Sequence, residues 1–351
     1  CRRVLFRSAG PHGKTTTTSM ISQILLETAD DPTISVGGIL DAIHSNVHVG
    51  DSDVFITEAC EYTNSYHSFY PKYNLILNVE ADHLDFFINL ENVRASFKKF
   101  ARNTSDDGIL IINKEIDDVD YFTEGLKCQV ITYSLKNDAD IYPSDITYNE
   151  KGCASFIPVF NGKSLDRVTL NVPGVHNVSN ALAAIALSIE MGVSYENILS
   201  GLAKFGGAHR RFEYKGSLGG VTIIDDYAHH PDEITATLSA AVKYPHNKLW
   251  VVFQPHTYTR TMSLMDEFAN ALQVADAVVL PDIYAAREKN IYGISSGDLQ
   301  KKLETLGTES YYIPEFDDVE TFLLKNISEG DLLITMGAGN VVEIGDSLLG
   351  K

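Results

Sequence analysis

Short apolar runs alternate with stretches of helical periodicity through most of this chain. A brief apolar strand at residues 4–6 leads into a glycine loop, and residues 15–29 then repeat apolar side chains at helical spacing. A second helix is predicted at residues 92–101, and runs typical of buried parallel strands lie at residues 53–58, 75–79 and 108–113. Because strands and helices alternate, the first part is predicted to be α/β with a mainly parallel sheet.

The pattern changes between residues 129 and 172. Short strands separated by turn residues predict a small antiparallel appendage that extends the first domain. Two helices follow, at residues 177–191 and 195–204, and the second ends at Phe205-Gly206-Gly207. We place the domain boundary near Phe212, which predicts domains of residues 1–211 and 212–351.

The second domain repeats the alternation of strand and helix. Strands are predicted at residues 221–224, 249–253, 277–280 and 331–335. Helices are predicted to begin near Pro231, Ser263, Ser296 and Val319. This order predicts a second, Rossmann-like α/β domain.

Composition and charge narrow the class of protein. The 351 residues are 44% hydrophobic and 21% charged, which indicates a globular chain too long for one ordinary core. A net charge of -19 argues against nucleic acid or an anionic membrane as the main partner. No apolar run reaches the length of a membrane span, and the four scattered cysteines suggest neither a zinc site nor a disulfide framework, so we expect a cytoplasmic protein.

The strongest chemical signal is a loop between the first strand and the first helix. Gly10 and Gly13 let backbone N–H groups approach phosphates, Lys14 supplies a cation, and Thr15 supplies a hydroxyl for Mg²⁺. Ser8 stands where the usual loop has its first glycine, so the loop is shorter than the common form. The alternative is an ordinary glycine turn before a helix. The sequence favours a triphosphate site.

Six motifs in order along residues ~9 to ~345 resemble those of the Mur ligases, which build the peptide stem of bacterial cell-wall precursors with ATP. They are residues 10–18 (GPHGKTTTT), 78–85 (NVEADHLD), 173–181 (PGVHNVSNA), 210–213 (RRFE), 225–231 (DDYAHHP) and 253–256 (FQPH). The last two are most similar to those of the branch that adds the first amino acid. Members of that branch carry about a hundred further residues before the loop, a domain that holds the UDP end of the substrate, and we expect it to be missing here.

The resemblance implies the substrates, the cofactors and the phosphate-side residues. ATP would phosphorylate the carboxylate of UDP-N-acetylmuramate, and L-alanine would displace the phosphate in peptidoglycan precursor synthesis. Catalytic roles fall to Lys14, Glu58, His83 and Arg211, with Mg²⁺ held by Thr15, Glu58 and His83. Cys60 replaces an aspartate common in the family. The ATP-binding set would be Gly10, His12, Gly13, Lys14, Thr15, Thr16, Asn177, Asn180, Arg211 and Asp226.

Several of these assignments have alternatives. Asn177 could cap its helix, alone or while also binding adenine, and the pair Asp225-Asp226 could cap the helix after it instead of Asp226 binding ribose. Arg210 is the alternative to Arg211 for the γ-phosphate. Some family members hold a second metal through a carbamylated lysine, for which Lys98 is the candidate, but the sequence favours a solvated helix face for Lys98.

The amino acid is assigned to Tyr227, His230, His256 and Arg260. Alanine-adding members often grip the amino-acid carboxylate with two arginines, but Thr257 takes the first place here, so the clamp is single or completed by His230. A tripeptide-adding ligase of the same family is the alternative function. An ATP-binding fragment inactive without the N-terminal domain is another. The sequence does not predict the oligomeric state.

Overall fold

The chain folds into two compact units in the computed structural model, which describes residues 4–81 and 84–351. The N-terminal unit comprises residues 1–149 and 153–208, and the C-terminal unit comprises residues 150–152 and 209–351. Within the described residues, no helix is long and apolar enough to cross a membrane.

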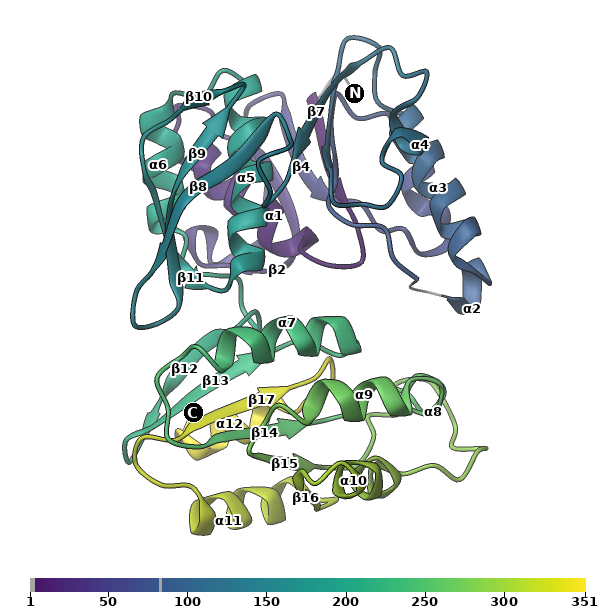
Figure 1. Ribbon diagram of the computed structural model, residues 1–351, viewed down its shortest axis with the longest axis vertical. Helices are drawn as coiled ribbons and strands as arrows, with labels where there is room; N and C mark the ends of the chain where they lie inside the picture. Colours follow the sequence, from purple (N-terminus) through teal and green to yellow (C-terminus); the bar gives the residue numbers. More distant parts are fainter. Residues whose placement is uncertain (1–3, 82–83) are drawn as a thin grey trace. The chain divides into compact units, whose positions relative to one another are not determined.

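The N-terminal unit is built on an 11-stranded sheet in which β1 is central (Figure 1). Parallel pairing joins β1 to both β4 and β5 and continues outward to β2 and to β6, β7 and β8. The strands are β1 (Val4–Ala9), β2 (Thr33–Leu40), β3 (Ser45–His48), β4 (Val54–Glu58), β5 (Tyr73–Ile76), β6 (Ile109–Asn113), β7 (Gln129–Tyr133), β8 (Ile141–Tyr148), β9 (Cys153–Phe160), β10 (Lys163–Ser164) and β11 (Val168–Pro173).

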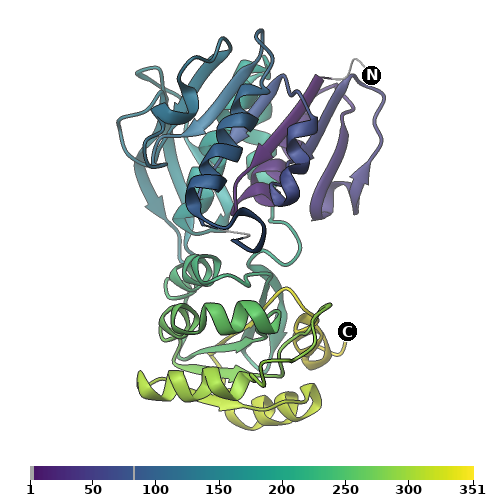
Figure 2. The same cartoon turned by 90° about the vertical axis from the view of Figure 1, so that its right-hand side faces the viewer.

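Helices cover both faces of this sheet. One face packs against α1 (Lys14–Leu26), α5 (Val175–Glu190) and α6 (Tyr195–Lys204), and the other against α3 (Leu90–Arg102) and α4 (Asp120–Thr123). The turned view shows α3 in front of the strands (Figure 2). Two short helical segments, η2 (Tyr62–Ser68) and α2 (Leu84–Phe87), precede α3, and η1 (Asp41–Ile43) joins β2 to β3.

The predicted antiparallel appendage is confirmed, and it continues the main sheet. β8 pairs in parallel with β7 at Tyr133 and Ile141, and β9 then runs antiparallel to β8, β10 and β11. The side chains of β11 alternate between buried and exposed, as expected for a strand with one covered face.

The C-terminal unit has a six-stranded sheet in the order β12-β13-β17-β14-β15-β16, in which all pairs are parallel except that β12 runs antiparallel to β13. Its strands are β12 (Glu213–Leu218), β13 (Val221–Asp226), β14 (Leu249–Phe253), β15 (Ala277–Leu280), β16 (Glu309–Tyr312) and β17 (Leu332–Met336). Its helices are α7 (Pro231–Ala241), α8 (Tyr258–Ser263), α9 (Met265–Leu272), α10 (Ser296–Thr305), α11 (Phe316–Asn326) and α12 (Val342–Leu348). The predicted fold class, two successive α/β folds with an antiparallel extension of the first, is confirmed.

Several elements differ from their predicted form for physical reasons. β3, β12 and β16 lie at sheet edges, where polar side chains remain partly exposed and the apolar pattern is lost. β2 was not predicted, because Gly37-Gly38 interrupts its run of apolar side chains. The helix predicted near Ser263 is two helices, because Leu264 interrupts them with a non-helical φ/ψ.

Gly201 provides a test of the packing between α1 and α6. A Cβ at this position would lie 2.5 Å from the Cα of Ile24, so the two helices would have to separate. We expect Gly201→Ala to destabilise the N-terminal unit by about 1–3 kcal/mol, despite the ~1 kcal/mol that alanine adds in helix propensity. Urea unfolding followed by circular dichroism would measure this. Gly206→Ala, with nothing within 4 Å of its Cβ, is the control, and equal midpoints would contradict the prediction.

Candidate active site

The loop between β1 and α1 requires glycine at two positions. Gly10 and Gly13 have φ values of 143° and 80°, and Gly13 is the N-cap residue of α1. A Cβ at Gly10 would lie 2.7 Å from Asn78 Oδ1, and one at Gly13 would lie 2.7 Å from Asn180 Oδ1. The loop is therefore closely packed between the end of β5 and the start of α5.

Asn78 also holds the loop in shape. Its Oδ1 accepts the His12 N–H at 3.0 Å, and its Nδ2 donates to the His12 carbonyl at 3.0 Å. The His12 ring lies 3.2 Å from the Glu80 carboxylate. The first backbone hydrogen bond of α1 runs from Thr17 to Gly13, so the N–H groups of Lys14, Thr15 and Thr16 point out of the helix start. Such a helix start attracts an anion.

Lys14 lies in this loop with a carboxylate partner that the sequence analysis missed. Its Nζ donates to the Gly10 carbonyl at 2.5 Å and to Glu61 Oε1 at 2.8 Å. Glu61 is only 3% exposed. The available signal was its position three residues after Glu58, on the loop that leaves the neighbouring parallel strand. The ammonium is thus held by a carboxylate that phosphate oxygens would have to replace.

Thr15 and Glu58 form an arrangement of oxygen atoms that fits Mg²⁺. Thr15 Oγ1 donates to Glu58 Oε2 at 3.1 Å, and Glu58 Oε1 accepts the Gly37 N–H at 2.5 Å. A Cβ at Gly37 would lie 3.0 Å from both carboxylate oxygens and 3.1 Å from the Thr15 hydroxyl, so this space exists because the residue is glycine. Hydroxyl and carboxylate oxygens are ligands that Mg²⁺ prefers. His83, the third predicted ligand, lies outside the described residues.

Asn177 and Asn180 lie buried in the first turns of α5, close to the phosphate loop. Asn180 Oδ1 accepts from Thr17 Oγ1 at 3.2 Å, and Asn180 Nδ2 donates to Asn177 Oδ1 at 3.2 Å. Asn177 does not cap the helix, because Gly174 is the N-cap and Asn177 Nδ2 donates to the Pro173 carbonyl at 2.7 Å. The two amides thus form a network that reaches the loop through Thr17.

Arg210 has a structural role within the C-terminal unit. Its Nε donates to the fully buried Asp225 at 2.9 Å, and its two terminal nitrogens donate to the carbonyls of Gly339 and Gly337 at 3.0 and 2.6 Å. Burial raises the pKa of Asp225, and Arg210 opposes that rise. Three of the five guanidinium N–H donors are thus used within this unit, which fixes the Arg210 side chain in place.

Arg211 makes weaker contacts within the C-terminal unit than Arg210 does. It lies 3.7 Å from the Glu233 carboxylate, with 31% of its side chain exposed. Asp226 instead holds the backbone at this point, accepting the Phe212 N–H at 2.7 Å and the Ala228 N–H at 2.8 Å. Burial raises the pKa of Asp226 to about 6 against the charge of Arg211. The alternative that Asp226 caps α7 is wrong, since His230 is the N-cap and its ring accepts from Asp232 N–H.

The loops after β13 and β14 bring three of the four predicted amino-acid residues, Tyr227, His256 and Arg260, together with His229. The His229 ring lies 5.3 Å from the Tyr227 ring and 5.9 Å from the His256 ring. Burial, followed by the charges of His229 and Arg260, lowers the pKa of His256 to about 4. Burial also lowers the pKa of His229, and Arg260 contributes to this. A neutral imidazole can accept a hydrogen bond from an amine, and the guanidinium beside it can bind a carboxylate.

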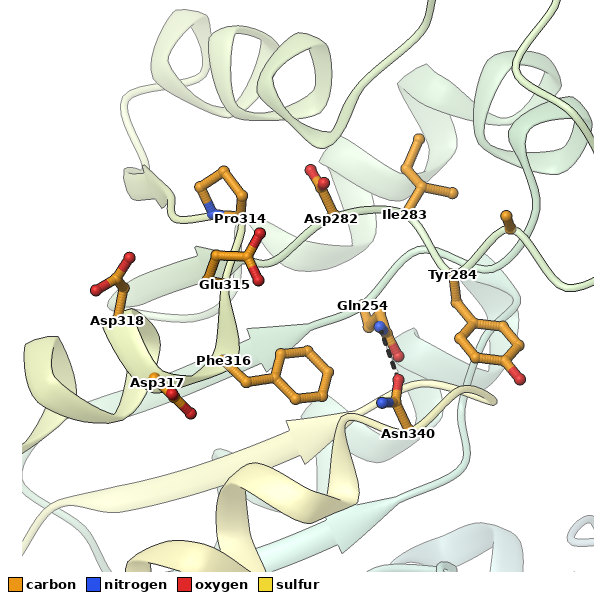
Figure 3. Close-up of a pocket in the computed structure, with 11 residues that line it drawn as sticks. Gln254, Asp282, Ile283, Tyr284, Pro314, Glu315, Phe316, Asp317, Asp318 and Asn340 are labelled. Carbon is orange, nitrogen blue, oxygen red and sulfur yellow. Dashed lines mark hydrogen bonds between the residues drawn. The ribbon is translucent and has the colours of Figure 1, made fainter.

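A cavity of about 600 Å³ lies at the carboxyl ends of β14 to β17 (Figure 3). Tyr284 lines it and stacks on His256 at 5.6 Å, so the cavity borders the amino-acid residues without including them. Its other lining groups include Gln254, Asp282, Glu315, Phe316 and Asn340. Gln254 Nε2 donates to Asn340 Oδ1 at 3.2 Å across its floor.

Lys98 lies on α3 with its Nζ 3.9 Å from the centre of the Tyr121 ring. This contact joins α3 to the start of α4 and gives the ammonium a cation–π partner. The described residues provide no contact between Lys98 and the Thr15–Glu58 pair.

Comparison with known proteins identifies both units. The model of the Mur ligase middle domain matches residues 9–188, and that of the Mur ligase glutamate ligase domain matches residues 210–339. The chain belongs to the Mur ligase family. Members of this family are ATP-dependent ligases, and the phosphate loop of this Mur ligase lies in the first matched domain.

Individual relatives show which branch of the family the chain is most similar to. UDP-N-acetylmuramate–L-alanine ligase of Agathobacter rectalis is 60% identical over 343 residues, which are 98% of this chain and 75% of that protein. The crystal structure of UDP-N-acetylmuramate–alanine ligase from Thermotoga maritima matches with a TM-score of 0.84 and 30% identity, over 99% of this chain and 75% of that one. A murein peptide ligase from Psychrobacter arcticus matches with a TM-score of 0.72 and 25% identity, over 99% and 77%.

The different environments of Arg210 and Arg211 predict that replacing them with alanine lowers the stability of the C-terminal unit by different amounts. Arg210→Ala leaves the buried Asp225 unpaired and is expected to destabilise the C-terminal unit by about 3–5 kcal/mol. Arg211→Ala removes a long, partly exposed ion pair and is expected to cost less than about 1 kcal/mol. Urea unfolding followed by the fluorescence of Trp250, the only tryptophan and buried in this unit, would measure both. Equal losses would show that Arg210 is not the structural member of the pair.

Proposed function

We propose that this Mur ligase joins L-alanine to the carboxylate of UDP-N-acetylmuramate in peptidoglycan precursor synthesis, in the cytoplasm. The observation that carries the proposal is the 60% identity, over 98% of the chain, to a relative with that named activity. Among the solved structures, the alanine ligase matches with 30% identity and a TM-score of 0.84, against 25% and 0.72 for the murein peptide ligase, which favours alanine over a peptide as the added group. We assign the ATP-binding role to residues 1–211 and the amino-acid role to residues 212–351.

The phosphate loop would bind ATP through backbone N–H groups that are free of helix hydrogen bonds at the start of α1. The N–H groups of Lys14, Thr15 and Thr16 would receive phosphate oxygens, with Gly10, His12 and Gly13 shaping the loop. The Lys14 ammonium would leave Glu61 for the β- and γ-phosphates, a movement of one flexible side chain. Arg211 would add a second positive charge at the γ-phosphate, since Arg210 is held by Asp225.

Mg²⁺ would be held by Thr15 and Glu58, whose oxygens lie 3.1 Å apart, and by His83. When bound, it would offset the charge of the triphosphate and of the substrate carboxylate. Asn177, Asn180 and Asp226 would contact the nucleoside. Asn180 connects that region to the loop through Thr17.

The reaction would proceed in two balanced steps. The muramate carboxylate attacks the γ-phosphorus and ADP leaves, which gives an acyl phosphate. The amine of L-alanine then attacks the acyl carbon, loses a proton and expels inorganic phosphate. His256, Tyr227 and His230 would surround the amine, and Arg260 would bind the alanine carboxylate. The neutral ring of His256 can accept a hydrogen bond from the incoming amine.

Release of ADP tests this proposal. The chain is mixed with Mg-ATP and UDP-N-acetylmuramate, with L-alanine, with the tripeptide or with neither. We expect turnover that requires UDP-N-acetylmuramate and L-alanine, and a loss of at least roughly 100-fold in Lys14→Ala, because an electrostatic contact to the transferred phosphoryl group is removed.

The control is Lys204→Ala, which should retain activity, because Lys204 is an exposed lysine paired at 2.6 Å with Glu27, the C-cap residue of α1. Turnover with the tripeptide but not with alanine would assign the chain to the other branch. ADP release independent of both acceptors, or none at all, would contradict the ligase proposal for this chain, which spans about three quarters of its relatives' length.

A further inference from the structure

Glu288 lies between β15 and α10 but is bound to the turn that carries Arg260. Its Oε2 accepts the Thr259 N–H at 3.0 Å, and its Oε1 accepts the Thr259 hydroxyl. Burial would raise the pKa of Glu288, but hydrogen bonds from Thr259, Tyr258 and Thr257 outweigh it and leave the pKa below its usual value. One carboxylate thus receives most of the donors at the start of α8.

This turn needs an external partner because its own backbone is strained. Thr257, the N-cap of α8, has a φ of 66°, which is unfavourable for a β-branched residue. Its Oγ1 accepts the Arg260 N–H at 3.4 Å, and its carbonyl accepts the Thr261 hydroxyl at 2.7 Å. A six-residue helix provides little stability by itself. The conformation must therefore be maintained from outside.

The loop that supplies Glu288 is fixed to the same place at a second point. The Thr257 N–H donates to the Tyr284 carbonyl at 2.9 Å, and the Tyr284 N–H donates to the Pro255 carbonyl at 2.9 Å. Ala286 then has a φ of 51°, which turns the chain so that Glu288 points back to α8. Backbone pairing holds the two loops together, and Glu288 fixes the orientation of the short helix.

We propose that Glu288 is a positioning residue for L-alanine, which acts by fixing the Thr257–Arg260 turn so that Arg260 meets the amino-acid carboxylate. The inference rests on the proposed function. Arg260 lowers the pKa of both His229 and His256, which places its charge beside them. With threonine at position 257, Arg260 is the one arginine in residues 253–263, so its direction determines the carboxylate contact.

Steady-state kinetics with the full chain test the proposal. Glu288→Gln keeps the shape but loses the charge and one acceptor, so the KM for L-alanine should rise about ten-fold while kcat and the KM for ATP change less than about two-fold. In an Arg260→Ala background, Glu288→Gln should have no further effect. Glu267→Gln, an exposed residue of α9 in the same unit, makes the same change in net charge and should leave all constants unaltered.

The alternative is that Glu288 only stabilises the fold. In that case Glu288→Gln would change kcat and every KM together, or would raise the KM for L-alanine equally in the Arg260→Ala background. Either result, or an unchanged KM for L-alanine, would overturn the proposal.

A measurement without turnover separates this inference from the proposed function. Amide hydrogen exchange at Thr259 and Arg260 should be faster in Glu288→Gln, and the pKa of His256 in NMR titration should fall, because Glu288 raises it. Unchanged exchange would overturn the positioning role even in a chain without ligase activity. Faster exchange with no turnover in the unaltered chain would instead count against the ligase alone.

Discussion

The parallel pairing of β1 with β4 on one side and β5 on the other is the constraint on which the phosphate-binding region depends. Because all three strands end at the same edge, the loops that follow them meet there. The first loop brings Lys14, the second brings Glu58 and Glu61, and the third brings Asn78. Register is equally important, since Ser8 lies opposite Glu58, and a shift of one residue would turn that carboxylate to the other face.

Much of this arrangement could be predicted from the sequence. Buried strands are continuous apolar runs, so the ends of those predicted from such runs were found to within three residues in both units. The glycines of the phosphate loop were also interpretable, because left-handed backbone and close packing leave few other choices. Edge strands were missed, since their half-exposed side chains do not show the periodicity that marks a core.

Side-chain partners were harder to predict, because they depend on which loops meet in space. Glu61 lies three residues after Glu58 in the sequence, yet only the pairing of β1 with β4 explains why it faces Lys14. The sequence alone could not show which of Arg210 and Arg211 is free to meet a phosphate. The structure distinguishes them, because Arg210 is paired with the buried Asp225. The proposed helix-capping roles of Asn177 and Asp226 were wrong because glycine and histidine occupy those caps. His83 remains a prediction.

The position of β17 has a consequence for synthesis of the chain. This strand, residues 332–336, is the last of its sheet in sequence but lies in the middle, between β13 and β14. Until it leaves the ribosome, β13 and β14 have no partner between them and expose backbone edges that other chains can pair with. The C-terminal sheet therefore cannot close until β17 itself has been synthesised.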